Sequence, residues 1–242
     1  MLNTHYKKIE GIRLPVKIYE SDSDTLVLTI HGGAWYSIKE DSDDWDGGWM
    51  DFHARYFNKK GYKAAAISYR DVNFDDTTTV FDLIEDCRDA VKFLREKIDF
   101  KRLIIIGDSA GGHLATMLGL DEEINAEIVV VANPVVDLTH PSWKHTAKNE
   151  EDYIKASPLF NIKKTNTSFL VLHGNCDETV PIETSIEFCK KMVDTGNDCT
   201  FKEIDGAPHA FILLGYKSTD EEVARYMKIV DEYLEEKLNV QL

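Results

Sequence analysis

The residue in this chain best suited to covalent chemistry is Ser109, which stands between two small residues, Gly107 and Gly111. An apolar run at 103–106 precedes this G-x-S-x-G segment and a helix-like run follows it, so the segment predicts a sharp turn between a strand and a helix. Such a turn strains the serine backbone and lifts the hydroxyl above the end of the strand. Free N–H groups at the start of the helix would stabilise negative charge developing there. The pattern therefore indicates a nucleophile rather than an ordinary helix N-cap.

A serine hydroxyl is a weak nucleophile unless a base takes its proton, and that base needs a carboxylate to orient it. Asp177 follows the apolar run 169–172, and His209 follows the alternating run 200–204. Both would lie in loops at the carboxyl ends of strands, where open parallel sheets gather their active sites. The chain order Ser, Asp, His also fits a nucleophile on a strand–turn–helix. We therefore predict a catalytic triad of Ser109, Asp177 and His209.

Other residues compete for the roles of acid and base. Glu178 and Asp137 are alternative acids, although Asp137 also suits a turn or cap. Asp108, next to the nucleophile, is expected to be a structural carboxylate. Five other histidines are assigned to local hydrogen bonds, packing or solvent: His31, His173, His113, His140 and His145.

A glycine loop, His31-Gly32-Gly33-Ala34-Trp35, follows the strand-like run 25–30. A tetrahedral intermediate needs backbone N–H donors aimed at its oxyanion, and glycines let a backbone approach closely. One donor is expected at Ala110, the residue after the nucleophile. The second is expected at Gly33 or Ala34.

Four motifs occur in order along the chain: H-G-G-x-W from 31, G-D-S-A-G-G-H-L-A from 107, H-G-x-x-D-x-x-V-P from 173 and D-G-x-x-H-x-F from 205. Together they resemble the α/β-hydrolase superfamily, especially its hormone-sensitive-lipase-like esterases and the acetyl-xylan and feruloyl esterase-like hydrolases. The resemblance runs from about Leu26 to the C-terminus. It implies an α/β-hydrolase fold and a serine carboxylesterase that needs no cofactor, and the length of the sequence leaves no room for a separate lid domain. Ala34 departs from the common H-G-G-G form but keeps its N–H.

The resemblance leaves alternatives open at the level of activity. Kynurenine formamidases share the H-G-G-x-W loop, so an amide-cleaving hydrolase (an arylformamidase or a peptidase) remains a second hypothesis, because triad chemistry is shared between ester and amide cleavage. A non-catalytic binding protein on the same fold is a third. The intact Ser, Asp and His argue against it.

Strand-like and helical runs alternate along the chain, which predicts a mostly parallel central sheet with helices on both faces, in one domain over residues 1–242. The stretch 135–167 is irregular and is expected to form a small flap over the site, while the N-terminal arm is short. Strands are expected near Val16, Leu26, Ala64, Leu103, Ile128, Phe169 and Thr200, and helices over 49–60, 80–97, 109–120, 182–195 and 219–238.

The composition is acidic, with 28 Lys and Arg against 43 Asp and Glu and a net charge of −15 over 242 residues. That charge makes nucleic acid and anionic membranes poor partners, so the expected partner is a small-molecule ester. No run approaches the roughly 20 apolar residues that span a bilayer, and residues 1–15 lack a signal-peptide pattern. No residue spacing suggests a metal site.

The four cysteines show no paired spacing and are expected to be free thiols in a reducing compartment, so we predict a cytoplasmic protein. They are Cys87, Cys176, Cys189 and Cys199. The sequence sets no oligomeric state.

Tryptophans and an acidic run follow the glycine loop. Trp35 and Trp45 are expected to line the substrate pocket, because aromatic faces suit sugar rings or aryl groups; packing is an equal alternative for Trp35. Trp49 is expected to pack. The acidic run 40–46 reads as a solvated face that would also repel anionic substrates. The resulting hypothesis is a carboxylesterase for small, short-acyl esters, with acetylated or feruloylated carbohydrate as a candidate substrate.

Overall fold

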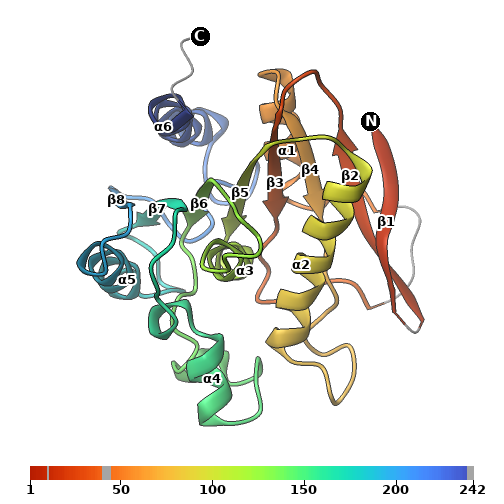
Figure 1. The fold of residues 1–242 in the computed structure, drawn as a ribbon. Helices are drawn as coiled ribbons and strands as arrows, with labels where there is room; N and C mark the ends of the chain where they lie inside the picture. Colours follow the sequence, from red (N-terminus) through yellow and green to blue (C-terminus); the bar gives the residue numbers. More distant parts are fainter. Residues whose placement is uncertain (10, 40–44, 239–242) are drawn as a thin grey trace.

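A computed structural model describes residues 1–9, 11–39 and 45–238 (Figure 1). Its strands form an eight-stranded sheet in the order β1-β2-β4-β3-β5-β6-β7-β8. The first three strands in this order pair antiparallel, and all pairs from β4 to β8 are parallel. The strands are β1 (Leu2–Ile9), β2 (Ile12–Tyr19), β3 (Thr25–Ile30), β4 (Lys63–Ile67), β5 (Arg102–Asp108), β6 (Ile128–Ala132), β7 (Ser168–Gly174) and β8 (Cys199–Ile204).

Helices cover both faces of this sheet (Figure 1). Buried side chains of α2, α3 and α5 pack in one apolar cluster, and those of α1 and α6 pack in a second cluster across the sheet. The helices are α1 (Asp51–Lys59), α2 (Val80–Lys97), α3 (Ala110–Gly119), α4 (Glu150–Ala156), α5 (Ile182–Asp194) and α6 (Asp220–Leu238). In this described part of the chain, no helix combines the length and apolar composition needed to cross a membrane.

The central strands owe their position to side chains that alternate between the two clusters. In β3, Leu26 and Leu28 belong to the cluster with α2 and α3, whereas Val27 belongs to the cluster with α1 and α6. Successive strand residues point to opposite faces, so a strand covered on both sides must be apolar at nearly every position. This requirement explains why these strands appear in the sequence as continuous apolar runs. The predicted mostly parallel sheet between helical layers is confirmed.

Two secondary-structure elements, β1 and α4, were not predicted from the sequence. β1 carries polar and charged side chains, which do not alternate like a half-buried strand, and pairs at the edge of the sheet with a register shift between His5 and Lys7. Edge strands commonly carry charge. The stretch taken as an N-terminal arm is therefore part of the sheet. The second missed element, α4, is a seven-residue helix capped by Asn149, whose side chain accepts the Asp152 N–H.

The flap (135–167) joins β6 to β7 and contains α4 between two short 3-10 turns, η1 (Pro141–Trp143) and η2 (Pro158–Phe160). Trp143 packs edge-on against Trp35 of the glycine loop, with ring centroids 5.6 Å apart. His113 of α3 is hydrogen-bonded to both segments, because its Nδ1 accepts the Trp35 indole N–H at 3.1 Å and its Nε2 lies 2.8 Å from the Ala156 carbonyl oxygen. The flap is thus a packed segment fixed to the elements that border Ser109.

Candidate active site

Ser109 lies at the sharp turn between β5 and α3, with φ 53° and ψ −118°. This φ is in the left-handed region that non-glycine residues rarely adopt, so the backbone is strained at the residue predicted to be the nucleophile. The turn is closed on both sides by glycine. A Cβ on Gly107 would overlap the Gly111 carbonyl, and a Cβ on Gly111 would overlap the Ile30 carbonyl of β3. The two glycines therefore let β5, α3 and β3 approach closely at this turn.

The structure brings Ser109, His209 and Asp177 together from three separate loops. The Oγ of Ser109 lies 2.9 Å from Nε2 of His209. On the other side of the imidazole, Nδ1 lies 2.7 Å from Oδ2 of Asp177. The Asp177 carboxylate is fully buried, while the His209 side chain is 12% exposed. One continuous hydrogen-bonded path therefore leads from the hydroxyl through the imidazole to a buried carboxylate.

Four donors hold the Asp177 carboxylate. Its Oδ1 accepts the backbone N–H groups of Thr179 and Val180 at 2.8 and 2.9 Å. Its Oδ2 faces His209 and also Nε2 of His173, 3.3 Å away. Burial alone would raise the pKa of Asp177, but the hydrogen bonds from His173, His209 and the Val180 N–H outweigh burial and hold this pKa well below its usual range. Asp177 is therefore ionised at any pH near neutrality.

His173 forms local hydrogen bonds, as expected, but its contact with Asp177 was not predicted from the sequence. Its side chain is fully buried at the end of β7, and its Nδ1 lies 2.8 Å from the Ser185 hydroxyl on α5. Nε2 faces the Val180 carbonyl oxygen at 3.1 Å as well as Asp177, so it carries the proton. The H-G-x-x-D spacing was the available signal, because residues four apart around a tight turn can meet.

The competing acids lie elsewhere. Oδ1 of Asp137 accepts the N–H and the hydroxyl of Thr139 within its own turn, at 2.8 and 2.7 Å. Glu178 is exposed to solvent. Neither is hydrogen-bonded to His209, whose Nδ1 partner is Asp177.

The glycine loop turns through three successive residues of positive φ, namely Gly33 (99°), Ala34 (54°) and Trp35 (63°). Tyr69 fixes its start, because the phenol hydroxyl donates to the His31 carbonyl at 2.8 Å. Within the described residues, no acceptor is found for the N–H groups of Gly33, Ala34 or Ala110. These are the three donors predicted for an oxyanion.

Asp108 is almost completely buried beside the site, and its Oδ1 finds no hydrogen-bond partner among the described residues. Burial raises the pKa of Asp108 to about 7; the positive charge that His209 can carry opposes this rise, and the Asp177 carboxylate adds to it. Ionisation of Asp108 is thus costly near neutral pH.

The aromatic residues near the glycine loop correct two expectations. Trp35 is fully buried, bonded to His113 and packed on Trp143, so it cannot contact a substrate directly. Trp49, expected to pack, is 61% exposed and stacks on Tyr216 with ring centroids 5.8 Å apart. Trp45 lines a pocket together with residues of the glycine loop. The acidic residues 40–44 lie outside the described residues.

This pocket has a volume of about 390 Å³ and lies against the glycine loop; none of Ser109, Asp177 and His209 lines it. Its wall includes Gly32, on which a Cβ would lie 3.1 Å from the Cβ of Ser109. The remaining lining residues are His31, Gly33, Tyr36, Ser37, Ile38, Trp45, Gly48, Trp49 and Ser68.

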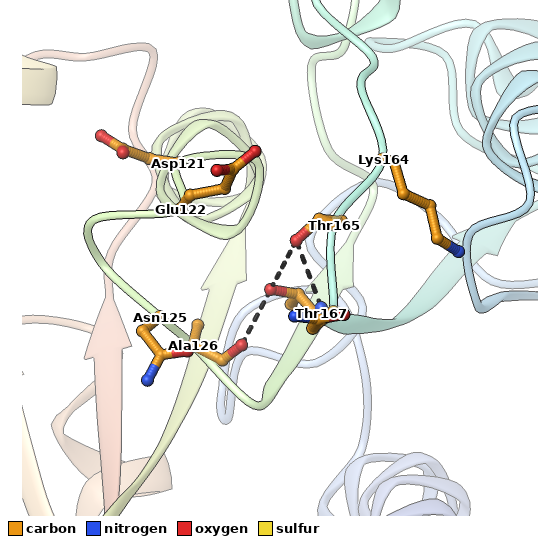
Figure 2. Close-up of a pocket in the computed structure, with 8 residues that line it drawn as sticks. Asp121, Glu122, Asn125, Ala126, Lys164, Thr165 and Thr167 are labelled. Carbon is orange, nitrogen blue, oxygen red and sulfur yellow. Dashed lines mark hydrogen bonds between the residues drawn. The ribbon is translucent and has the colours of Figure 1, made fainter.

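A second pocket, shown in Figure 2, lies at the opposite end of the sheet. Ala126 stands just before β6, and Thr165 and Thr167 just before β7, so they mark the amino ends of these strands. Thr167 donates to the Ala126 carbonyl at 2.8 Å and bonds to Thr165 (Figure 2). This pocket holds none of the predicted site residues. Within residues 1–9, 11–39 and 45–238, no group of three or more His, Cys, Asp or Glu residues is placed to hold a metal ion.

Comparisons with known proteins give relatives of several kinds. The sequence is 26% identical to the probable carboxylic ester hydrolase LipM of Mycobacterium tuberculosis over 189 residues, which cover 64% of this chain and 43% of LipM. It is 30% identical to inactive dipeptidyl peptidase 10 of Mus musculus over 125 residues, 47% of this chain and 15% of that protein. The chain thus spans less than half the length of these curated relatives.

A solved structure matches over nearly the whole chain. It is an esterase from Thermogutta terrifontis with propionate bound, 25% identical, with a TM-score of 0.80 over 97% of this chain and 93% of that chain. The fold is that of an α/β-hydrolase, as the motif resemblance predicted, and the similar proteins include a probable carboxylic ester hydrolase and an esterase. More particularly, the chain belongs to the BD-FAE family, whose profile matches residues 12–134.

Proposed function

We propose that this protein hydrolyses carboxylic esters, with Ser109 as nucleophile, His209 as general base and Asp177 as the acid that orients the base. The observation that carries the proposal is the path of two hydrogen bonds, 2.9 and 2.7 Å long, through the His209 imidazole. A nucleophile and base within hydrogen-bond reach, with the base held by a third group, is the arrangement that acyl transfer requires.

The proposed reaction has two halves. Ser109 Oγ attacks the ester carbonyl carbon while His209 Nε2 takes the hydroxyl proton, and the N–H groups of Ala110 and of Gly33 or Ala34 stabilise the oxyanion. His209 then gives the proton to the leaving alcohol, and an acyl-enzyme remains. Water, deprotonated by His209, attacks this ester and releases the acid. Ionised Asp177 stabilises the imidazolium that forms in each half.

The proposed substrates are small esters with short acyl groups, including acetylated or feruloylated carbohydrate. The pocket of about 390 Å³ at the glycine loop supports this choice, because Tyr36, Trp45 and Trp49 offer flat apolar faces to a sugar or aryl ring. The propionate bound to the Thermogutta terrifontis esterase is a short acyl group of the same kind.

The test is covalent labelling with a fluorophosphonate probe, followed by rates on 4-nitrophenyl acetate. The wild type should be labelled at Ser109, and Ser109→Ala should lose labelling and kcat by on the order of 10⁶-fold, as triad losses do. Ser142→Ala, at an exposed serine of the flap, is the matched control and should keep both. Folded Ser109→Ala protein that retains a tenth of the rate would refute the assignment.

A substrate panel separates ester from amide cleavage. Acetyl, butyryl and dodecanoyl 4-nitrophenyl esters, acetylated xylo-oligosaccharides, methyl ferulate and formyl-kynurenine should be compared by kcat/KM. We expect the short esters to be preferred. A higher kcat/KM for formyl-kynurenine than for every ester would replace the proposal with an arylformamidase.

A further inference from the structure

The side chains of two of the four cysteines are in contact at a place remote from the candidate active site. Cys189 lies on α5 and Cys199 is the first residue of β8, and their sulfur atoms are 2.9 Å apart although both are free thiols. A disulfide bond is about 2.05 Å long and tolerates only a narrow range of backbone separations. Less than about 1 Å of movement would bring these sulfurs to bonding distance. We propose that Cys189 and Cys199 form an intramolecular disulfide when a hydroperoxide oxidises the protein.

The surroundings of the pair fit this chemistry. Cys189 is 5% exposed, whereas Cys199 is half-buried and is the more accessible residue of the pair. A hollow of about 290 Å³ opens over both residues, lined by Ile186, Lys190, Val193, Asp194 and Phe201. The Cys199 contact and burial raise the pKa of the Cys189 thiol, which keeps it protonated until its neighbour reacts.

The reaction balances with hydrogen peroxide as the oxidant. The Cys199 thiolate attacks one peroxide oxygen, which gives a sulfenic acid and releases hydroxide. Cys189 then attacks the sulfenic sulfur, the S–O bond breaks, and water leaves as the S–S bond forms. Two thiols lose two electrons and two protons in total, and the peroxide is reduced to two waters. The other cysteines lack such a neighbour: Cys87 is fully buried and Cys176 is exposed in the Asp177 loop.

The disulfide would join the last half of α5 to the start of β8. Cys199 stands at the amino end of β8, and the His209 loop follows the other end of that strand. The bond therefore leaves the triad in place, and we expect kcat to stay within twofold. The closed loop is short, because the two cysteines are ten positions apart. Tethering it should raise Tm by roughly 5 to 10 °C by restricting the unfolded chain.

The experiment treats the purified, reduced protein with one equivalent of hydrogen peroxide, then counts thiols and maps peptides without reduction. Mapping uses Cys176→Ser, because trypsin leaves Cys176 and Cys189 on one peptide, 165–190, and Cys199 on another, 192–202. We expect two thiols to disappear and these two peptides to be linked. The increase in Tm should appear in wild type and in Cys176→Ser, and should reverse with dithiothreitol.

Two variants make the result decisive. Cys199→Ala changes a half-buried position and should fold, yet it should show no linked peptide and no rise in Tm. Cys189→Ser should do the same. Survival of all four thiols, linkage of Cys176 instead, or conversion of Cys199 to sulfinic acid without linkage would each overturn the proposal. A loss of esterase activity in Ser109→Ala has no bearing on this outcome, so the two proposals fail independently.

Discussion

At the scale of single residues, four hydrogen-bond donors surround the buried carboxylate of Asp177. It meets His209 on one side and His173 on the other, and two backbone N–H groups hold its second oxygen. This cage fixes the carboxylate in one orientation. The negative charge is what the proposed mechanism requires, because a neutral amide in its place would favour the wrong imidazole tautomer.

Replacing Asp177 by asparagine should therefore lower kcat by about 10⁴-fold while KM changes little. The matched variant is Asp137→Asn, which removes a turn carboxylate that accepts hydrogen bonds from Thr139. It should keep at least half of the activity. The measurement is kcat on 4-nitrophenyl acetate, with circular dichroism to verify folding. The reverse ranking would move the proposed acid to Asp137.

Asp108 gives a second residue-scale prediction, on stability. Its pKa is raised by burial from 3.8 to about 7, so between these values the folded protein holds a proton that the unfolded chain releases. Stability from this group is present at low pH and is lost as pH rises towards 7. Asp108→Asn cannot ionise. Its unfolding free energy relative to wild type should therefore grow by about 2 to 3 kcal/mol between pH 5 and pH 8.

Urea unfolding of both proteins at these two pH values measures that difference. Three histidines with lowered pKa values, the buried His53 and His113 and the partly buried His31, also titrate with pH, but they do so equally in both proteins and cancel. Asp177 stays ionised throughout. Parallel pH profiles would mean that Asp108 is charged in the folded state at pH 5.

The sequence predicted which three residues meet at the site, because motif order and strand-end position are properties of the chain. It did not predict the contact of His173 with Asp177, and it left packing and substrate contact as equal alternatives for Trp35. Both depend on how a side chain turns within packed loops. A tryptophan after the glycine loop could pack in the core or line a pocket. Contacts with residues from distant segments determine which of the two it does.

At the scale of elements, the site depends on the close approach of β3, β5 and α3. Gly111 permits the contact between α3 and β3, since any Cβ there would overlap the backbone of Ile30 and His31. Gly112, the next residue of the same helix, faces Pro134, with the nearest atoms 3.1 Å from a built Cβ. The two glycines are neighbours on one helix but differ in the room around them.

Gly111→Ala should lower the unfolding free energy by about 1 to 3 kcal/mol through overpacking and should also reduce kcat, because α3 must move away from the glycine loop. Gly112→Ala, the control, should change stability by less than about 1 kcal/mol, since alanine also favours the helix. Chemical denaturation and esterase rates measure both effects. Equal behaviour of the two variants would contradict the close contact with β3.

The regular elements were predictable where amphipathic or fully apolar runs were long. The bounds of α2 match the predicted helix, 80–97. α5 and α6 each differ by one residue from the helices predicted over 182–195 and 219–238. The failures, β1 and α4, share one cause. Neither contributes a long apolar run, so each is held by neighbours rather than by its own pattern: β1 by pairing with β2, and α4 by packing within the flap.

At the scale of the whole molecule, the net charge of −15 dominates long-range interactions. A field of this sign repels anions at distances beyond direct contact. Salt screens it over roughly 8 Å at physiological ionic strength. Charge should therefore influence how fast a substrate arrives, and not the chemistry that follows.

We expect neutral esters to exceed carboxylate-bearing esters of the same size severalfold in kcat/KM at low salt. The ratio should fall towards one as sodium chloride rises from about 0.02 M to about 0.5 M, because exposed charges are then screened. A pair such as 4-nitrophenyl butyrate and 4-nitrophenyl hemisuccinate measures it, with the neutral ester as internal control. If this ratio of kcat/KM values does not change with salt concentration, the preference for neutral esters arises from direct contacts in the pocket instead.

The two hydrogen bonds of His113 bear on how this protein can be re-engineered. One imidazole joins the indole of Trp35 to the carbonyl of Ala156, and so sets the spacing of three segments that are distant in the chain. A library can exchange the flap for loops of other lengths. Loss of the Ala156 carbonyl would then leave the buried ring N–H of His113 without an acceptor, which would lower the free energy of unfolding by about 1 to 3 kcal/mol. Grafted flaps should therefore keep a backbone acceptor at position 156. Diversity is better introduced at Trp45, because the other two aromatic side chains of the pocket stack on distant segments, Tyr36 on His145 of the flap and Trp49 on Tyr216.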